Sequence, residues 1–333
     1  MLRLVEYSAP HRDGAIALWN RAFRALRNFV ALDRASWRAR IEDLAIPGAG
    51  DALAGSGPQR FDPRHFRLAL DGEEVVGLAH GGTWEDAFLA RLLPGGRKAR
   101  VGTLLVIAVD PARRRRGIGG ALLGDLVDAL GRTSGIEGPL RADGRGFNPF
   151  YGNVIAPLPP PWGTPVGIAL PAGDSGGRAF FRAAGFREEV EARTRARSLA
   201  DRPRFAREVP AGFVIEEIAD WKPILGTDDG VAFPLANESR TWILREGDHQ
   251  RAALVAYPLR ADGSHWGIHS FEVESPRRGE GLGRLLLEYA IAALAQRGAK
   301  ELEALAIPSE APEAAHLYES LGFEPAEPWV ILG

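Results

Sequence analysis

A stretch of fifteen residues that occurs twice constrains the fold of this chain more than any other feature. Residues Val109 to Leu123 resemble residues Val273 to Leu287, and matching positions are 164 residues apart throughout. Each stretch contains Arg-x-x-Gly-x-Gly followed by leucines. Self-similarity at this separation indicates one structural unit present in two copies. The length of 333 residues accommodates two domains of ordinary size.

A second shared element follows each copy of the first. Residues Phe180–Phe186 and Leu317–Phe323 both end in Gly-Phe, and they are 137 residues apart. The first copy therefore contains 27 additional residues, which fall near 143–174, where proline and glycine are frequent. We divide the chain into an N-terminal domain, 1–205, and a C-terminal domain, 206–333.

The inserted segment contains four aromatic residues, Phe147, Phe150, Tyr151 and Trp162. They either line an acceptor pocket, wedge between the two domains, or form a packed surface loop over the joint.

The secondary structure expected from the pattern is the same in both copies. Strands at 101–109 and 266–273 run directly into the Arg/Gly loops, and each loop opens an amphipathic helix. Hairpin strands precede them, and short strands with a last helix follow. The expected fold class is α+β, with a mixed, partly parallel central sheet flanked by helices. Further elements are expected at 13–23, 36–44, 66–70, 74–78, 138–142, 188–198, 213–218, 242–244, 253–257 and 301–305.

The two loops have the composition of a site for a pyrophosphate. Glycines let backbone N–H groups approach phosphates closely, and a helix N-terminus adds unpaired donors and partial positive charge. Arginines add forked, charge-assisted hydrogen bonds. A dinucleotide-binding fingerprint fits poorly, because Leu122 and Leu286 stand where the third glycine belongs. Neither copy has the Gly-Lys-Ser/Thr of a Walker loop.

These motifs together resemble the GNAT superfamily of N-acetyltransferases, and two such domains in one chain resemble its tandem members, among them the mycothiol synthases. The resemblance implies acetyl-CoA as cofactor, with its pyrophosphate on the loop and its pantetheine arm along the preceding strand. The residues that it assigns to cofactor binding are Ile107, Val109, Arg114, Arg115, Arg116, Gly117, Ile118, Gly119 and Gly120 in the first copy and Phe271, Val273, Arg277, Arg278, Gly279, Gly281, Leu282, Gly283 and Arg284 in the second.

The resemblance also implies where the chemistry takes place. The family commonly uses a tyrosine of the last helix as the acid that protonates the leaving thiolate. Tyr318 stands at this place in the second copy, whereas the first copy has Phe181, which has no proton to give. We therefore expect a catalytic C-terminal domain and an N-terminal domain that is degenerate for catalysis.

The resemblance does not directly assign a general base. Many family members carry a glutamate where this chain has Thr103 and Gly267. His269, with an ordinary pKa near neutrality, is the preferred substitute, and Glu272 is a second candidate on the same strand. The family also often has an asparagine at the place of Ala311.

Composition limits the remaining possibilities. The chain has no cysteine, which excludes an acyl-cysteine intermediate and thiolate metal sites, and no metal site is expected. A net charge of −2 gives no basic field for nucleic acid. No apolar run is long enough for a membrane span, so we expect a cytoplasmic protein. The expected partner is a small-molecule or peptide amine, and the oligomeric state stays open. The alternative is a non-catalytic acyl-CoA-binding or sensor protein.

Overall fold

A computed structural model gives the architecture of the chain, and two large sheets dominate it. It describes residues 1–43, 61–84, 101–132, 141–142, 151, 160–200, 208–219, 221–223, 232–234 and 238–332. The structure is mixed α and β, as the sequence predicts, and a parallel strand pair occurs in each copy. Among the described helices, none combines the length and low polarity that crossing a bilayer requires.

The first copy is built on a five-stranded sheet in the order β1-β2-β3-β4-β5. The tight turn at Asp71-Gly72 joins β2 to β3 where the sequence predicts a hairpin, and Gly72 adopts φ 63°. Leu122, Leu126 and Leu130 of α4 are buried, because their four-residue spacing places them on one helix face. The elements are β1 Leu2–Glu6, α1 Arg12–Phe23, α2 Arg34–Trp37, β2 Phe66–Asp71, β3 Glu74–Trp84, β4 Val101–Val109, α4 Ile118–Gly131, β5 Arg141–Ala142, β6 Leu170–Pro171, α5 Ser175–Ala183 and β7 Glu188–Ser198.

The described part of the second copy repeats this plan with strands, and no α-helix, ahead of the loop. Its sheet has eight strands in the order β6-β15-β7-β14-β13-β12-β11-β8, and the long helix α6 packs on one face of it. The elements are β8 Phe213–Ala219, β9 Trp221–Pro223, β10 Ala232–Pro234, β11 Arg240–Glu246, β12 His249–Pro258, β13 His265–Val273, α6 Leu282–Gln296, β14 Glu301–Ala306, α7 Pro312–Ser320 and β15 Glu324–Leu332.

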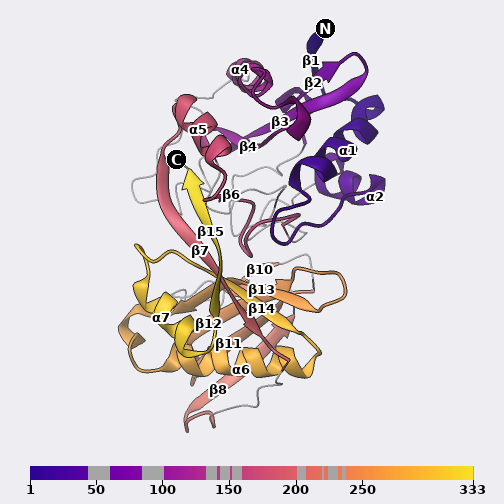
Figure 1. Ribbon diagram of the computed structural model, residues 1–333. Helices are drawn as coiled ribbons and strands as arrows, with labels where there is room; N and C mark the ends of the chain where they lie inside the picture. The colour runs from indigo at the N-terminus through magenta and orange to yellow at the C-terminus, as the bar shows by residue number, and fades with distance from the viewer. Residues whose placement is uncertain are drawn as a thin grey trace.

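Strand pairing between β7 of the first copy and β14 and β15 of the second copy connects the two copies. The last strand of the first copy, β7, lies between β14 and β15 of the second copy and pairs antiparallel with both. In Figure 1, β7 and β15 run side by side from the lower unit into the upper one, and the C-terminus lies near α5 and β6. The sequence predicts a strand at 188–198 correctly, but not its place in the sheet of the other copy. The boundary at 205/206 stays a prediction.

The contact between the copies also includes buried polar groups. Arg27 of the first copy donates to Glu303 (2.7 Å) and Glu301 (3.0 Å) of β14, and the amide of Asn28 donates to Glu303. Glu303 is fully buried. His265 lies within 3.4 Å of the same carboxylate. His265, Glu301 and Glu303 are close enough together for a metal ion, and Arg27 pairs with both of these carboxylates.

Candidate functional site

The parallel ladder splits at the same place in both copies. In the part of the chain that the structure describes, β4 pairs with β5 at Thr103 and Leu104, and β13 pairs with β14 over His265–Gly267. Among the described residues, no strand pairs with the rest of that edge of β4 or β13, up to the Arg/Gly loops. An unpaired strand edge presents backbone N–H and C=O groups that can pair with an extended ligand.

Each split leads to a loop of the same construction. A short 3₁₀ turn follows the strand, and then Gly117 or Gly281 adopts φ 81° and caps α4 or α6. This left-handed conformation favours glycine and turns the free N–H groups of the first helical turn toward the loop. Arg114 donates to the carbonyl of Val109 (3.3 Å), and Arg278 donates to that of Val273 (3.2 Å).

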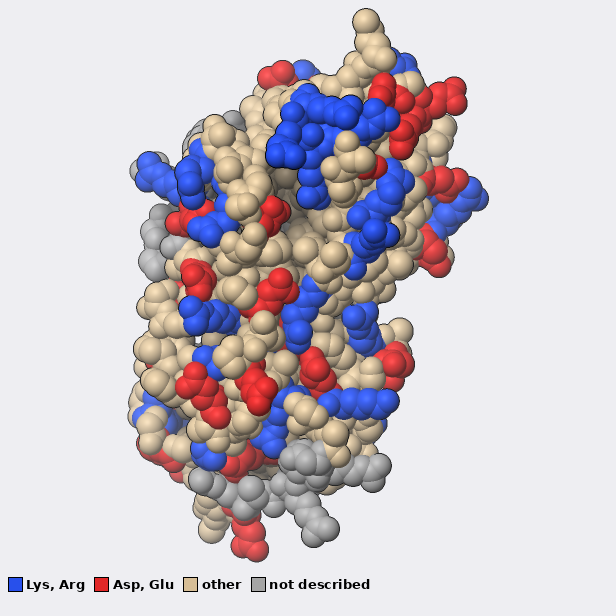
Figure 2. Space-filling view, in the orientation of Figure 1, with Lys and Arg blue, Asp and Glu red and all other residues tan. Residues whose placement is uncertain are grey.

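The two loops differ in charge. Arg115 and Arg116 are exposed in the first copy, whereas the second copy has Gly279 and Glu280 at these positions. Arg277 is paired with Glu246 and Glu280, whose carboxylates raise its pKa above the ordinary value. The first loop is therefore the more cationic one. Figure 2 shows basic side chains gathered at the top of the molecule, in the area of β4 and α4, with a hollow below them.

A cavity of about 630 Å³ opens beside the loop of the first copy. One wall is β4, and other walls come from α1, α5 and the segment around Trp162. The far end of the chain also contributes, because Val330 and Leu332 of β15 line the same space. The predicted cofactor residues that line this cavity are Ile107, Val109, Arg114, Arg115, Gly117, Ile118, Gly119 and Gly120.

An aromatic ring lies against the first turn of the helix in both copies, Phe180 near Gly119 and Phe271 near Gly283. A Cβ on Gly283 would come within 3.3 Å of the Phe271 ring and 3.1 Å of Val273. Phe271 therefore lies against the first turn of α6, where the first copy has the smaller Ile107. Leu282 is buried beneath this turn, and Arg284 pairs with Glu288 on the helix surface.

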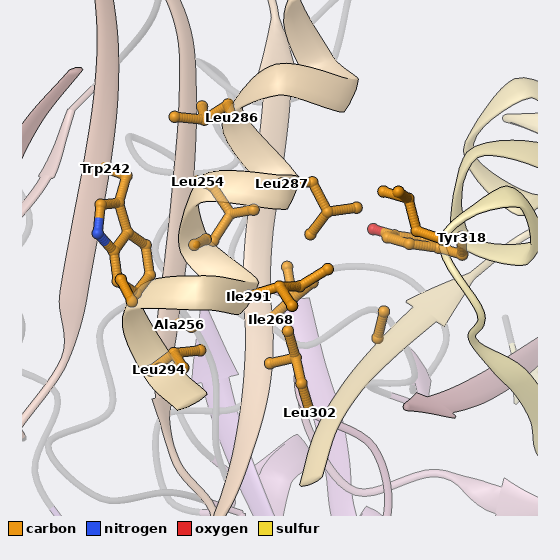
Figure 3. Close-up of a cluster of buried hydrophobic side chains, with 14 of the residues drawn as sticks. Trp242, Leu254, Ala256, Ile268, Leu286, Leu287, Ile291, Leu294, Leu302 and Tyr318 are labelled. Carbon is orange, nitrogen blue, oxygen red and sulfur yellow. The ribbon is translucent and has the colours of Figure 1, made fainter. Parts of the chain in front are cut away.

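Tyr318, the predicted acid, lies in the apolar cluster between α6, α7 and the sheet. Figure 3 shows its hydroxyl pointing toward Leu287 of α6, with Ile268 of β13 close by. The side chain is 4% exposed, and burial raises the pKa of its hydroxyl above the ordinary value. Its role as the acid stays a prediction.

The base candidates lie apart from one another on β13. His269 is buried, and its ring centroid is 5.5 Å from that of Tyr257 on β12. Glu272 is exposed. Gly267 cannot carry the glutamate common in the family, because a Cβ there would lie 2.8 Å from Cβ of Pro165 in the first copy. Pro165 of the first copy thus occupies the space that a glutamate side chain at position 267 would need.

Of the inserted aromatic residues, Trp162 lines the cavity and Tyr151 is buried in the core of the first copy, whereas Phe147 and Phe150 lie outside the described residues. The sequence alone does not indicate that α1 and β15 contribute walls to this cavity. No local pattern marks them, because they come from distant parts of the chain.

Two segments of the chain, 28–142 and 208–323, match the model of the acetyltransferase (GNAT) family. Together they span more than half of the chain, so this protein belongs to the GNAT family and is an acyltransferase. The matches coincide with the two copies of the repeat, which confirms the tandem arrangement.

Relatives and solved structures of similar architecture agree with this assignment. The mycothiol acetyltransferase of Thermobispora bispora is 28% identical over 265 residues, covering 78% of this chain and 79% of its own. That of Clavibacter sepedonicus is 26% identical, covering 85% and 88%. A tandem GNAT protein from the clavulanic acid biosynthesis pathway superimposes with a TM-score of 0.62 at 19% identity, covering 100% of this chain and 98% of that one. The last likeness concerns the fold alone.

Proposed function

We propose that the protein transfers an acetyl group from acetyl-CoA directly to a primary amine of a small molecule or peptide. The split between the parallel strands, followed by the Arg/Gly loop, is the observation that carries this proposal. In the described part of the chain, the open edge of β13, like that of β4, offers backbone partners for the amides of a pantetheine arm, and the loop after each strand offers N–H groups and arginines for a pyrophosphate. The cavity beside β4 is of the size that cofactor pockets usually have.

Direct transfer follows from the absence of cysteine in the sequence. Without a thiol, the acetyl group cannot pass through an acyl-cysteine on the enzyme, and we propose that the amine attacks the thioester itself. We therefore expect sequential kinetics, in which both substrates are bound before CoA is released.

For the proton transfers we propose Tyr318 as the acid and His269 as the base of the second copy. The choice of Tyr318 rests on its place in α7, where the family commonly has its acid, and burial keeps its hydroxyl protonated by raising its pKa. His269 offers an imidazole on the strand that precedes the loop. His269 lies beside Tyr257, near the contact with the first copy. It is on the same sheet face as Gly267, where Pro165 leaves no space for a side chain.

The experiment is the Tyr318→Phe substitution. We expect kcat to fall about 100-fold, which is within the usual range for loss of a general acid, while the affinity for acetyl-CoA changes little. Release of CoA is measured against a panel of primary amines that includes the acceptor used by mycothiol acetyltransferases. Tyr289→Phe, which removes a tyrosine hydroxyl on α6, is the matched control. An unchanged kcat for Tyr318→Phe would remove Tyr318 from the mechanism.

A further inference from the structure

The strand β15 of the second copy has two kinds of surroundings in the first copy, one on each of its faces. Trp329 and Ile331 are buried in the core of the first copy, where the indole N–H of Trp329 donates to the hydroxyl of Thr194 (3.3 Å). Because side chains alternate along a strand, Val330 and Leu332 lie on the other face, and they line the cavity beside the first Arg/Gly loop. The second copy therefore supplies part of the wall of the first copy's cleft.

Two strands of the first copy hold this end of β15 in register. β6 pairs antiparallel with it, so that Leu170 lies opposite Val330, and β7 pairs along its other edge. Leu170 and Pro171 of β6 line the same cavity. In Figure 1, the arrow of β15 ends beside β6 and α5, within the upper unit. The wall made by β6 and β15 therefore exists only while β15 is paired with the first copy.

The other end of β15 starts at the core of the second copy. Phe323, which precedes the strand, is buried there, and its ring centroid is 5.2 Å from that of Tyr318. The backbone N–H of Phe323 also donates to the carbonyl of Tyr318 (3.0 Å). A single strand thus connects the helix that carries the proposed acid of the second copy with the cleft of the first copy.

We propose that CoA bound in the cleft of the first copy contacts β15 and holds this strand of the second copy in place. This inference rests on the proposed function, in that the first loop is taken to bind CoA. A ligand that binds better when β15 is paired with the first copy shifts the local opening of the strand toward the paired state. The coupling is reciprocal, so opening of β15 weakens CoA binding by the same factor.

Amide hydrogen exchange of the full-length protein, measured with and without CoA, tests the inference, and titration calorimetry supplies the Kd. With CoA at about 100 times its Kd, exchange of the amides of residues 329–332 should slow by up to about 100-fold. The edge strand β8, which does not line the cavity, is the internal control and should change less. Binding of CoA without slower exchange at 329–332 would overturn this inference alone. Absence of CoA binding would contradict the proposed function and the inference with it.

Variants of the two loops show which cleft produces the protection. Arg114→Ala with Arg115→Ala removes two cations from the first loop and should remove most of the protection at a fixed CoA concentration. Arg278→Ala, at the position of the second loop that matches Arg114, is the control and should keep the protection. If Arg278→Ala removes the protection and the first-loop variant keeps it, CoA acts from the second cleft and the inference is wrong.

Variants of β15 test the same coupling from the other side. Val330→Ala with Leu332→Ala shortens both side chains that line the cavity, so the affinity of the first cleft for CoA should fall by about fourfold or more, the value of one buried methylene. Glu324→Ala, at the exposed start of the same strand, is the control and should keep the affinity. An unchanged affinity in the Val330→Ala, Leu332→Ala variant would show that CoA does not contact β15.

Discussion

Arg115 has a backbone φ of 60°, the left-handed conformation that an ordinary side chain adopts only at a cost of about 1 kcal/mol or more. The second copy has Gly279 at the same position, with φ 88°. The loop therefore needs this conformation in both copies, and the first copy tolerates the strain with an arginine. In return for this backbone strain, the first copy has an exposed guanidinium beside the cavity, which Gly279 of the second copy cannot provide.

His80 of β3 gives a prediction about stability and pH. It is buried, with Nδ1 2.8 Å from the hydroxyl of Tyr151, and burial lowers its pKa to about 3. In the unfolded chain the imidazole takes up its proton near pH 6.5. Between these values the unfolded state binds one more proton, so the free energy of unfolding decreases as pH falls from 6.5 toward 3.

The size of this effect is about 1.4 kcal/mol per pH unit at most. Urea unfolding at several pH values measures it, and His80→Gln should reduce the slope between pH 6 and pH 4. His249→Gln, on an exposed histidine of β12, is the control and should leave the slope unchanged. Equal slopes for His80→Gln and the unsubstituted protein would show that His80 does not titrate in this way.

At single positions, the sequence shows what a residue is but not what it contacts. The absence of the family's glutamate at Gly267 is visible in the sequence. Its cause is Pro165, about one hundred residues earlier in the chain, and no local pattern reveals that contact. The opposite case is Gly117 and Gly281, whose φ of 81° follows from the local strand, loop and helix, and is therefore predictable.

At the scale of elements, the charge of the loop distinguishes the two copies. The Arg115→Gly, Arg116→Glu double variant gives the first loop the residues of the second. We expect it to weaken CoA binding in the first cleft by about tenfold or more, since two cations are lost and an anion is added beside the pyrophosphate. Calorimetry at fixed ionic strength measures this, and the remaining affinity should depend less on salt.

Arg132→Ala, at the exposed far end of α4, is the control for the loop exchange. The reverse exchange, Gly279→Arg with Glu280→Arg, should strengthen binding at the second loop. An affinity unaffected by the double variant in the first loop would mean that the pyrophosphate does not contact these arginines.

Most elements were predictable because their signals are local. The strand at 101–109, the hairpin turn at Asp71-Gly72 and the leucine spacing of α4 each depend on a few neighbouring residues, and the structure confirms them. The place of β7 was not predictable. Pairing between strands depends on which edges are free in the folded molecule, and the free edge that β7 fills belongs to the other copy.

At the scale of the whole molecule, Arg27 holds the copies together through a fully buried carboxylate. Arg27→Ala would leave Glu303 with Asn28 but without its cation, so we expect the free energy of unfolding to fall by about 3 kcal/mol. Urea denaturation measures this. Arg34→Ala, which removes an exposed pair with Asp13, should cost less than about 1 kcal/mol. An equal decrease in the free energy of unfolding for the two variants would show that the buried pair stabilises the protein no more than the exposed pair does.

The position of β7 between β14 and β15 has a consequence for synthesis on the ribosome, where the N-terminal part of a chain emerges first. β7 is complete at Ser198, about one hundred residues before β14 begins at Glu301, and β15 follows at Glu324–Leu332. Until β14 and β15 have been synthesised, both edges of β7 are without the strands with which they finally pair. During synthesis, β7 of the first copy can therefore reach its final pairing only after β14 and β15 of the second copy have been made.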